Sequence, residues 1–252
     1  EVHHLRLLMN EIFGEENFVE QIIWKKAYGG GAKVKQVVSL HEYVLCYARD
    51  TESLGFIELP PNPETRKYYK HKDEKYETRG PYRTQPLWTN SMDPRPNLRY
   101  PIKWKGQEIW PERQWQWQKS RVEEALENNE LVFVESDDDY SVYYKQYLRD
   151  ETGRERGAKP YSVLDGPYTQ EGTAEIAELF GDGKVFPFPK PSSLLKHLVS
   201  YTWTDENAIV LDFFAGSTST AQAVLEFNRE RGGNRQFIMV QFPEPTPEDC
   251  PA

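Results

Sequence analysis

The chain has 252 residues, enough for one large domain or two small ones, and a net charge of −9. No stretch approaches the roughly 18 apolar residues of a membrane-spanning helix, which excludes a membrane protein. Two cysteines, Cys46 and Cys250, exclude a disulfide scaffold and a cysteine-based zinc cluster. The chain opens without a signal-peptide pattern, so we expect a cytoplasmic protein.

The charge is unevenly distributed. Residues 66–119 contain 13 Lys and Arg but 6 Asp and Glu, a local net charge of +7, and five of the seven tryptophans. Basic side chains interleaved with flat aromatic ones suit a phosphate backbone with stackable bases. On charge alone, however, a solvated and loop-rich surface around a small tryptophan core is the better explanation.

Apolar periodicity predicts a helix over 1–13, ended by Gly14, and strands over 18–24 and 42–48. The loop 25–35 between the strands has three consecutive glycines, which let a backbone approach a partner closely. Its lysines favour an anion, although a plain mobile loop fits the composition equally well. The candidate phosphate contacts in this loop are Lys25, Lys26, Lys33 and Lys35.

From residue 51 to residue 158, prolines interrupt every long periodic pattern. We expect an inserted module of short strands and long loops there, with a helix over 117–126. Strands over 131–134 and 142–148 flank an acidic turn at Asp137, Asp138 and Asp139, which lacks the glycine and terminal glutamate of a calcium loop.

Regular patterns return near residue 172. Phe186 to Pro191 forms a rigid extended segment, because each proline fixes its own φ and restrains the preceding residue. The sequence predicts helices over 173–180 and 221–231 and strands over 208–214 and 237–242. A further helix is predicted through Leu194, Leu195, Leu198 and Val199, with Ser192 or Ser193 as its cap. The last strand, helix and strand form a βαβ unit, so the sheet is at least partly parallel and covered by helices.

The turn that follows strand 208–214 is the candidate ligand site, since ligands of open α/β sheets bind at the carboxyl ends of strands. Gly216 permits close approach, Asp212 supplies a carboxylate, and Glu244 follows the next strand, where such folds hold ribose hydroxyls. Taken by itself, a turn of small residues after a strand is also explained by packing, without any ligand. The chain has no G-x-G-x-x-G, which argues against a nicotinamide-dependent oxidoreductase, and no phosphate-binding P-loop.

Longer stretches of the sequence are more specific than this turn by itself. Leu211 to Ala221, followed by Gly232 to Glu244, closely resembles the cofactor half of β-class amino-methyltransferases of DNA, nearest to modification subunits of Type III restriction systems. Phe188 to Pro191 resembles the segment of that family that packs over the methionine part of the cofactor. Leu5 to Gly14 and His41 to Arg49 also resemble the family, as do Arg79 to Arg83 and Lys159-Pro160.

The resemblance implies an α/β, Rossmann-like, S-adenosylmethionine-dependent methyltransferase fold, with a mostly parallel sheet, helices on both faces and an inserted loop-rich α+β target-recognition module. Residues 1–50 would complete the catalytic subdomain, 51–158 would recognise DNA, and 159–252 would bind the cofactor. The cofactor-binding residues implied are Asp212, Phe213, Phe214, Ala215, Gly216, Ser217, Thr218, Thr220, Glu244, Phe188, Lys190 and Pro191.

The implied reaction is methylation of the exocyclic amine of a base flipped out of double-stranded DNA. The subgroup favours adenine N6 over cytosine N4, and a prokaryotic host. A second methyltransferase subunit and a restriction subunit with nuclease and helicase activity are the implied partners. Besides the loop lysines, the candidate DNA contacts are Arg79, Arg83, Arg99 and Lys103. The alternative is a DNA-binding module without a cofactor, built on the same scaffold.

Two departures from the family pattern stand out. Thr218 replaces a glycine of the cofactor turn, and the catalytic tetrapeptide of the Asp-Pro-Pro-Tyr type is absent. Leu59 to Asn62 and Asp93 to Pro96 do not match it. We therefore expect a fragment that holds no catalytic residue and does not methylate DNA by itself. The five histidines show no metal-ligand spacing, so no metal site is predicted.

Overall fold

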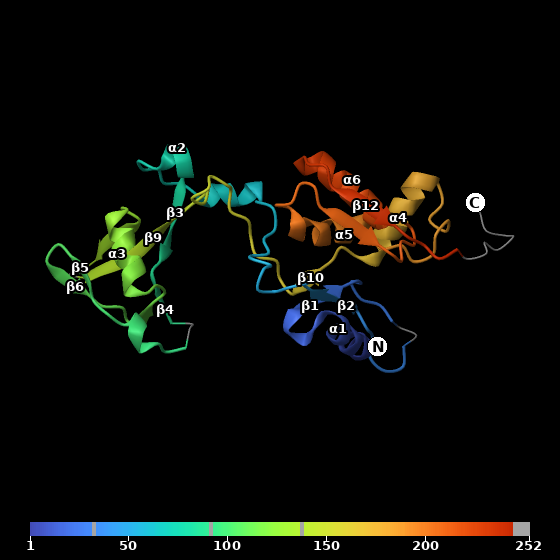
Figure 1. The fold of residues 1–252 in the computed structure, drawn as a ribbon, viewed down its shortest axis with the longest axis horizontal. Coiled ribbons are helices and arrows are strands. Elements are labelled where there is room, and N and C mark those ends of the chain that lie inside the picture. The colour runs from blue at the N-terminus through green and yellow to red at the C-terminus, as the bar shows by residue number, and fades with distance from the viewer. Residues whose placement is uncertain (32–33, 91–92, 137–138, 244–252) are drawn as a thin grey trace. The chain divides into compact units, whose positions relative to one another are not determined.

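The computed structural model describes residues 1–31, 34–90, 93–136 and 139–243. The chain forms two compact units, a first unit of residues 1–60 and 157–252 and a second unit of residues 61–156 (Figure 1). The DNA-recognition role given to residues 51–158 stays a prediction. No helix in the described ranges has the length and hydropathy needed to cross a membrane. Several residues discussed above lie outside the described ranges: Lys33, Asp137, Asp138, Glu244 and Cys250.

The first unit begins with α1 (Val2–Phe13), which ends at Gly14, as predicted, where φ is 88°. A short 3-10 turn (Glu15–Asn17) leads into a three-stranded sheet. Its strands are β1 (Phe18–Lys25), β2 (His41–Tyr47) and β10 (Val163–Asp165). The order is β10-β1-β2, with β1 parallel to β10 and antiparallel to β2. Strand β10 has three residues, too few for a periodic pattern, and was not predicted.

The C-terminal part of the first unit contains the predicted βαβ arrangement. Strand β11 (Ile209–Asp212), helix α6 (Ser219–Arg231) and strand β12 (Gln236–Met239) follow each other, and the strands pair in parallel. Helices α4 (Thr169–Phe180) and α5 (Ser192–Val199) precede them. Val199 of α5 packs with Val224 and Phe227 of α6 in a buried cluster. This packing holds α6 in place behind the strand pair.

Strands β11 and β12 differ from the prediction in their length and in how much of their surface is buried. Both β11 and β12 are shorter than predicted, because the chain bends after Asp212 and pairing ends there. The two strands form their own parallel pair, separate from the β10-β1-β2 sheet among the described residues. Ile209, Leu211 and Ile238 are each more than half exposed. The architecture is therefore mixed α/β with small sheets, and not the single sheet, covered on both faces, that was predicted.

The second unit has a three-stranded antiparallel sheet, ordered β3-β9-β8, beside helix α3 (Lys119–Glu127). Its strands are β3 (Tyr82–Pro86), β8 (Leu131–Ser136) and β9 (Asp139–Tyr147). The smaller elements are the 3-10 turns Pro63–Tyr68 and Pro96–Leu98, α2 (Tyr76–Arg79), the pair β4 (Trp88–Thr89) and β7 (Gln114–Trp115), and the pair β5 (Ile102–Trp104) and β6 (Gln107–Ile109). The prediction of α3, β8 and β9 is confirmed within a few residues.

Some of the tryptophans of the second unit lie in its core. Trp115 is 2% exposed, and Trp104 stacks on Phe133 with ring centroids 4.1 Å apart. Trp88 and Trp110, by contrast, are exposed. The buried cluster around Trp115 consists of Leu87, Ile102, Ile109, Val122, Ala125, Leu131 and Val142. Tryptophans of this segment therefore serve both the core and the surface.

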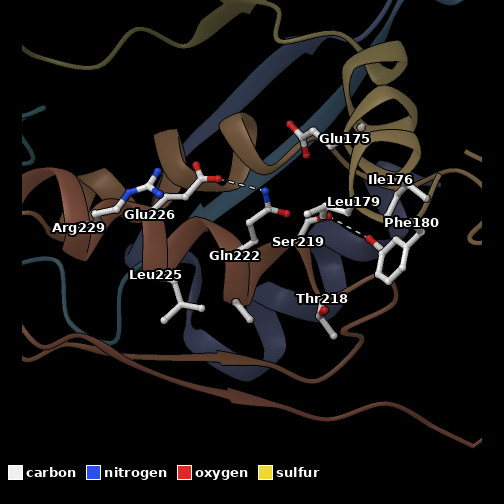
Figure 2. Close-up of a pocket in the computed structure, with 13 residues that line it drawn as sticks. Glu175, Ile176, Leu179, Phe180, Thr218, Ser219, Gln222, Leu225, Glu226 and Arg229 are labelled. Carbon is white, nitrogen blue, oxygen red and sulfur yellow. Dashed lines mark hydrogen bonds between the residues drawn. The ribbon is translucent and has the colours of Figure 1, made fainter. Parts of the chain in front are cut away.

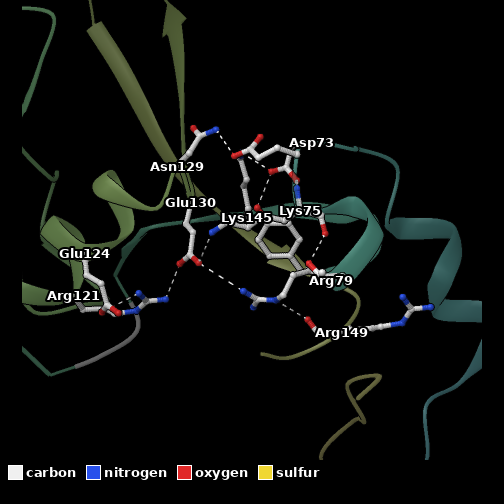
Figure 3. Close-up of polar contacts among 12 residues, drawn as sticks. Asp73, Lys75, Arg79, Arg121, Glu124, Asn129, Glu130, Lys145 and Arg149 are labelled. Atoms are coloured by element: carbon white, nitrogen blue, oxygen red, sulfur yellow. Dashed lines mark hydrogen bonds and ion pairs between the residues drawn. The ribbon is translucent and has the colours of Figure 1, made fainter. Parts of the chain in front are cut away.

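A buried polar network fastens the start of the second unit to its sheet (Figure 3). Asp73 accepts hydrogen bonds from Lys145 Nζ and Tyr147 Oη, both at 2.7 Å. Glu130 pairs with Arg121 at 2.8 Å, and also with Lys75 and Arg79 at 3.3 and 3.7 Å. Buried charges are costly unless they are paired. Each carboxylate and the cations around it therefore stabilise one another in the folded unit.

The Asp73 cluster makes the stability of the second unit depend on pH. Burial acts to raise the pKa of Asp73, but the bonds from Lys145 and Tyr147 outweigh it and lower the pKa below 3.8. The stabilisation is thus fully present above the pKa of the unfolded chain and is lost as pH falls through the lower folded pKa. We expect the gap in unfolding free energy between wild type and Asp73→Asn to shrink between about pH 5 and about pH 2 in urea titrations. A constant gap would contradict this assignment.

Candidate functional site

The chain turns sharply where β11 ends and α6 begins. Asp212 organises the turn, since its carboxylate accepts the Thr220 hydroxyl at 2.6 Å and the Phe214 N–H at 3.1 Å. Gly216 has a φ of 51°, a conformation that suits glycine, and its N–H donates to Gln241 Oε1 at 2.9 Å. Thr218 also has a positive φ, 59°, so the turn forms although threonine replaces the family's glycine there.

A hollow of about 230 Å³ lies at this turn. The segment 186–190 forms its opposite wall, and Ser219 Oγ ties the two together by donating to the Lys190 carbonyl at 2.7 Å. The prediction of a rigid extended segment is wrong at Phe188, where the chain bends and φ is 55°. Phe188 is 95% exposed and Phe214 80%, so aromatic surface is available beside the hollow. The residues that line it are Phe186, Phe188, Pro189, Lys190, Leu195, Asp212, Phe214, Ala215, Gly216, Ser217, Ser219 and Thr220.

Most of the predicted cofactor residues meet at this hollow, and their role remains a prediction. Those that line it are Phe188, Lys190, Asp212, Phe214, Ala215, Gly216, Ser217 and Thr220. Phe213 is outside the lining and exposed, Pro191 is buried, and Thr218 faces a different groove. Sequence reasoning missed Ser219, although a serine in the first turn of a helix that follows a strand is a recognisable signal. Glu244 lies outside the described residues.

The groove that includes Thr218 is larger, about 460 Å³, and lies between helices α4 and α6 (Figure 2). Its walls carry Ile176, Leu179 and Phe180, and Gln222 Nε2 donates to Glu226 Oε1 at 3.0 Å along α6. Size alone does not select this groove, because a cavity of about 590 Å³ lined by Ile22, Cys46 and Tyr201, among others, is larger still. The chemistry favours the hollow at the strand end, which brings a carboxylate, hydroxyls and a glycine to one point.

Another cavity, of about 360 Å³, shares Phe188, Pro189 and Lys190 with the hollow. Glu42 of β2 lies in it between two lysines, 2.8 Å from Lys26 Nζ and 2.6 Å from Lys190 Nζ. Burial acts to raise the pKa of Glu42, but the hydrogen bonds from Lys190 and Lys26 lower it overall. Glu42 is therefore ionised near neutral pH.

The predicted DNA contacts of the first unit differ in their surroundings. Lys25 pairs with Asp165 at 2.8 Å, Lys26 pairs with Glu42, and Lys35 is exposed. Lys33 lies outside the described residues. The neighbouring Asp165 carboxylate raises the pKa of Lys25. Lys35 thus has the more accessible charge.

The predicted contacts of the second unit fall into two kinds. Arg79 has a side chain only 13% exposed, pairs with Glu130, and donates to the Arg149 carbonyl. Arg83 donates to Gln146 Oε1 at 2.8 Å. Arg99 and Lys103 are exposed. Arg99 and Lys103 are therefore better candidates for DNA contacts than Arg79, whose charge is already paired. Over the described ranges, no three His, Cys, Asp or Glu side chains group as metal ligands.

Comparison with known proteins places these observations in a family. Residues 1–242 match a DNA methylase family of the N6/N4 class. The chain is 32% identical over 95% of its length to the Mod subunit of the Type III restriction-modification enzyme StyLTI of Salmonella typhimurium, and covers 35% of that protein. It is 28% identical over 97% of its length to the Type II methyltransferase M.KpnI of Klebsiella pneumoniae, and covers 60% of it.

A third relative is the Mod subunit of the Type III enzyme EcoP15I of Escherichia coli, 27% identical over the whole chain, of which the chain covers 43%. The chain thus spans between about a third and three fifths of the lengths of these relatives. The family match covers almost every described residue, including the turn after β11 and the segment 186–190. The resemblance predicted from the sequence is confirmed: the chain belongs to the N6/N4 DNA methylase family.

Proposed function

We propose that the chain binds S-adenosylmethionine in the hollow at the turn after β11 and serves as the cofactor-binding part of a DNA methyltransferase. One observation carries this proposal: the segment 186–190, distant in sequence from the turn, forms the facing wall of the same hollow. The βαβ unit β11-α6-β12 supports a Rossmann-like cofactor subdomain. The bound cofactor would supply an activated methyl group on sulfur.

The residues of the hollow suit an adenosine-bearing ligand. Gly216 leaves room for close approach, and the exposed rings of Phe188 and Phe214 offer flat surfaces for a purine. Asp212 uses its carboxylate to fix the turn, so its contribution includes the shape of the hollow. From the family resemblance we assign Glu244 to the ribose hydroxyls.

The proposed substrate is double-stranded DNA with one base flipped out of the stack. Adenine N6 is the preferred target and cytosine N4 the alternative. Two of the relatives described above carry the name Type III Mod subunit, so a restriction-modification system with a restriction subunit as partner is the proposed setting. The basic and aromatic surface of the second unit is the proposed DNA-recognition surface.

Exposed lysines at a DNA interface should govern the salt dependence of binding. Each phosphate contact contributes a slope of about 0.9 in a plot of log affinity against log salt. We expect Lys35→Gln and Lys103→Gln each to reduce the slope by about that amount in fluorescence-anisotropy titrations. Arg231→Gln, at an exposed arginine at the end of α6 and outside both proposed DNA-contacting regions, is the control. If a variant leaves the slope unchanged, the residue that it replaces does not contact a DNA phosphate.

The 252-residue chain should bind the cofactor without methylating DNA. Its single Pro-Pro pair, Pro60-Pro61, is preceded by Leu59 and followed by Asn62, so no polar-Pro-Pro-aromatic tetrapeptide is available to hold the target amine. The measurement is tritium transfer from labelled S-adenosylmethionine to an adenine-rich duplex. Transfer above background by the purified chain would refute the expectation.

The proposed function is tested by ultraviolet crosslinking of methyl-tritiated S-adenosylmethionine. Wild type should be labelled, an excess of S-adenosylhomocysteine should compete, and Asp212→Ala should lose most of the label. Equal, uncompeted labelling of both proteins would favour the DNA-binding module without a cofactor.

A further inference from the structure

Three exposed lysines near the start of the second unit, Lys67, Lys70 and Lys72, form a strip of positive charge. No ion pair joins them to a carboxylate in the described part of the chain, whereas their neighbours Arg66 and Lys75 each have one. We propose that this lysine strip binds phosphates of double-stranded DNA and anchors the duplex independently of its base sequence. The inference rests on the proposed DNA substrate and adds contacts to those predicted from the sequence.

The charge of the lysine strip is not neutralised within the second unit. Residues 65–72 include four lysine and arginine residues and no aspartate or glutamate. The next two carboxylates along the chain are occupied elsewhere, since Asp73 accepts from Lys145 and Tyr147, and Glu74 accepts from Asn129 Nδ2 at 2.9 Å. Neighbouring ammonium groups repel one another, and a row of phosphates removes that repulsion and releases its own counterions.

Aromatic rings orient two of the lysines and leave their charge available. Lys67 Nζ lies 5.3 Å from the ring centroid of Tyr68, and Lys72 Nζ lies 4.1 Å from that of Tyr76. A tyrosine ring attracts an ammonium group through its quadrupole but carries no net charge. Lys145, by contrast, is paired with a buried carboxylate. The lysines of the strip are therefore held in place while they can still attract an anion.

The backbone of the strip is fixed at both ends. At one end Arg66 and Glu155 form a bidentate pair, with Nε–Oε1 and Nη2–Oε2 distances of 2.8 and 2.6 Å. At the other end His71 and Tyr82 exchange two backbone hydrogen bonds, of 3.0 and 2.8 Å, which join the segment to the start of β3. The rings of His71 and Tyr82 also stack, 5.3 Å apart. Because the strip is ordered in advance, it loses less conformational entropy when it meets a rigid duplex.

The residue types of the strip favour contact with the DNA backbone over the reading of bases. An ammonium group acts as a point charge, and phosphates present the same charge along every sequence. Residues 67–72 include no arginine, asparagine or glutamine, the side chains that most often read base edges through paired hydrogen bonds. The strip therefore suits an anchor that contributes affinity while other residues select the sequence.

The proposal is tested by fluorescence-anisotropy titration of the 252-residue chain at several salt concentrations. The probes are an alternating A·T duplex and an alternating G·C duplex of equal length. Each lysine that neutralises a phosphate contributes about 0.9 to the slope of log affinity against log salt. The triple variant Lys67→Gln, Lys70→Gln and Lys72→Gln should therefore lose about 2.7 from the slope with both duplexes.

Two controls accompany this variant. Replacement of the same three lysines by arginine keeps their charge and should keep the slope. A second triple variant removes three exposed cations of the first unit and so matches the change in total charge. It carries Lys184→Gln, Arg229→Gln and Arg231→Gln and should bind both duplexes as wild type does. Thermal melting of each variant shows whether it is folded.

The outcomes separate this inference from the proposed function. If wild type binds neither duplex at low salt, the proposed DNA substrate fails and the inference with it. If wild type binds both and the triple glutamine variant loses no more slope than the charge-matched control, only the lysine strip is overturned. A loss confined to one duplex would indicate base reading and contradict the proposal, as would a loss seen with duplex RNA and absent with DNA. An equal loss with both DNA duplexes supports it.

Discussion

Replacement of Asp212 by alanine is expected to weaken the binding of S-adenosylhomocysteine about 100-fold, or about 2.8 kcal/mol. The Asp212 carboxylate accepts hydrogen bonds from Thr220 Oγ1 and from the Phe214 N–H. Bonds to a charged group contribute about 1.5–3 kcal/mol each, and here they hold the turn that shapes the hollow. The variant therefore loses both a charged group beside the ligand and the order of the backbone around it.

The control for this experiment is Asp205→Ala. Asp205 accepts the N–H of the residue two positions on, at 3.0 Å, as Asp212 does, but it lies in the loop before β11 and does not line the hollow. We expect this variant to bind as wild type does. Asp212→Asn keeps an acceptor oxygen without the charge, so its affinity should lie between those of wild type and Asp212→Ala. Equal affinity in wild type and Asp212→Ala, measured by isothermal titration, would place the ligand elsewhere.

Replacement of Glu130 by alanine should lower the unfolding free energy of the second unit by about 3 kcal/mol, the scale seen when one partner of a buried ion pair is removed. The Glu130 side chain is 9% exposed and pairs with Lys75, Arg79 and Arg121 (Figure 3). The variant leaves these cations together without the carboxylate between them. Repulsion and desolvation then both act against the folded state.

Urea unfolding followed by tryptophan fluorescence measures this effect, because five of the seven tryptophans lie in the second unit. The control is Glu123→Ala on α3, whose side chain is 61% exposed and 3.9 Å from Lys119. Exposed pairs contribute about 0–1 kcal/mol, so this control should unfold close to wild type. A loss below about 1 kcal/mol for Glu130→Ala would show that the network is not needed for stability.

Elements whose signal is local could be predicted from the sequence. Helix α1 has a periodic apolar face and a glycine at its end, and the unit β11-α6-β12 combines apolar strands with a small-residue turn. The hollow itself could be predicted only through the family resemblance. Nothing local to the segment 186–190 indicates that it faces a turn some 25 residues further on.

The missed features depend on contacts between distant residues. Strands β4 to β7 have two or three residues each, so they are defined by their partners and not by periodicity. Glu42 and Lys190 are 148 positions apart, and their pairing arises only when β2 and the segment 186–190 meet. Lysine composition suggested phosphate contacts at Lys25 and Lys26, yet the fold supplies Asp165 and Glu42 as partners for them.

The location of the cofactor is tested most directly by a crystal structure of the chain with S-adenosylhomocysteine. We expect density for the nucleoside between Phe188 to Lys190 on one side and Gly216 and Ser217 on the other, beside Asp212. Density in the larger groove between α4 and α6, with the hollow free of ligand, would contradict the account.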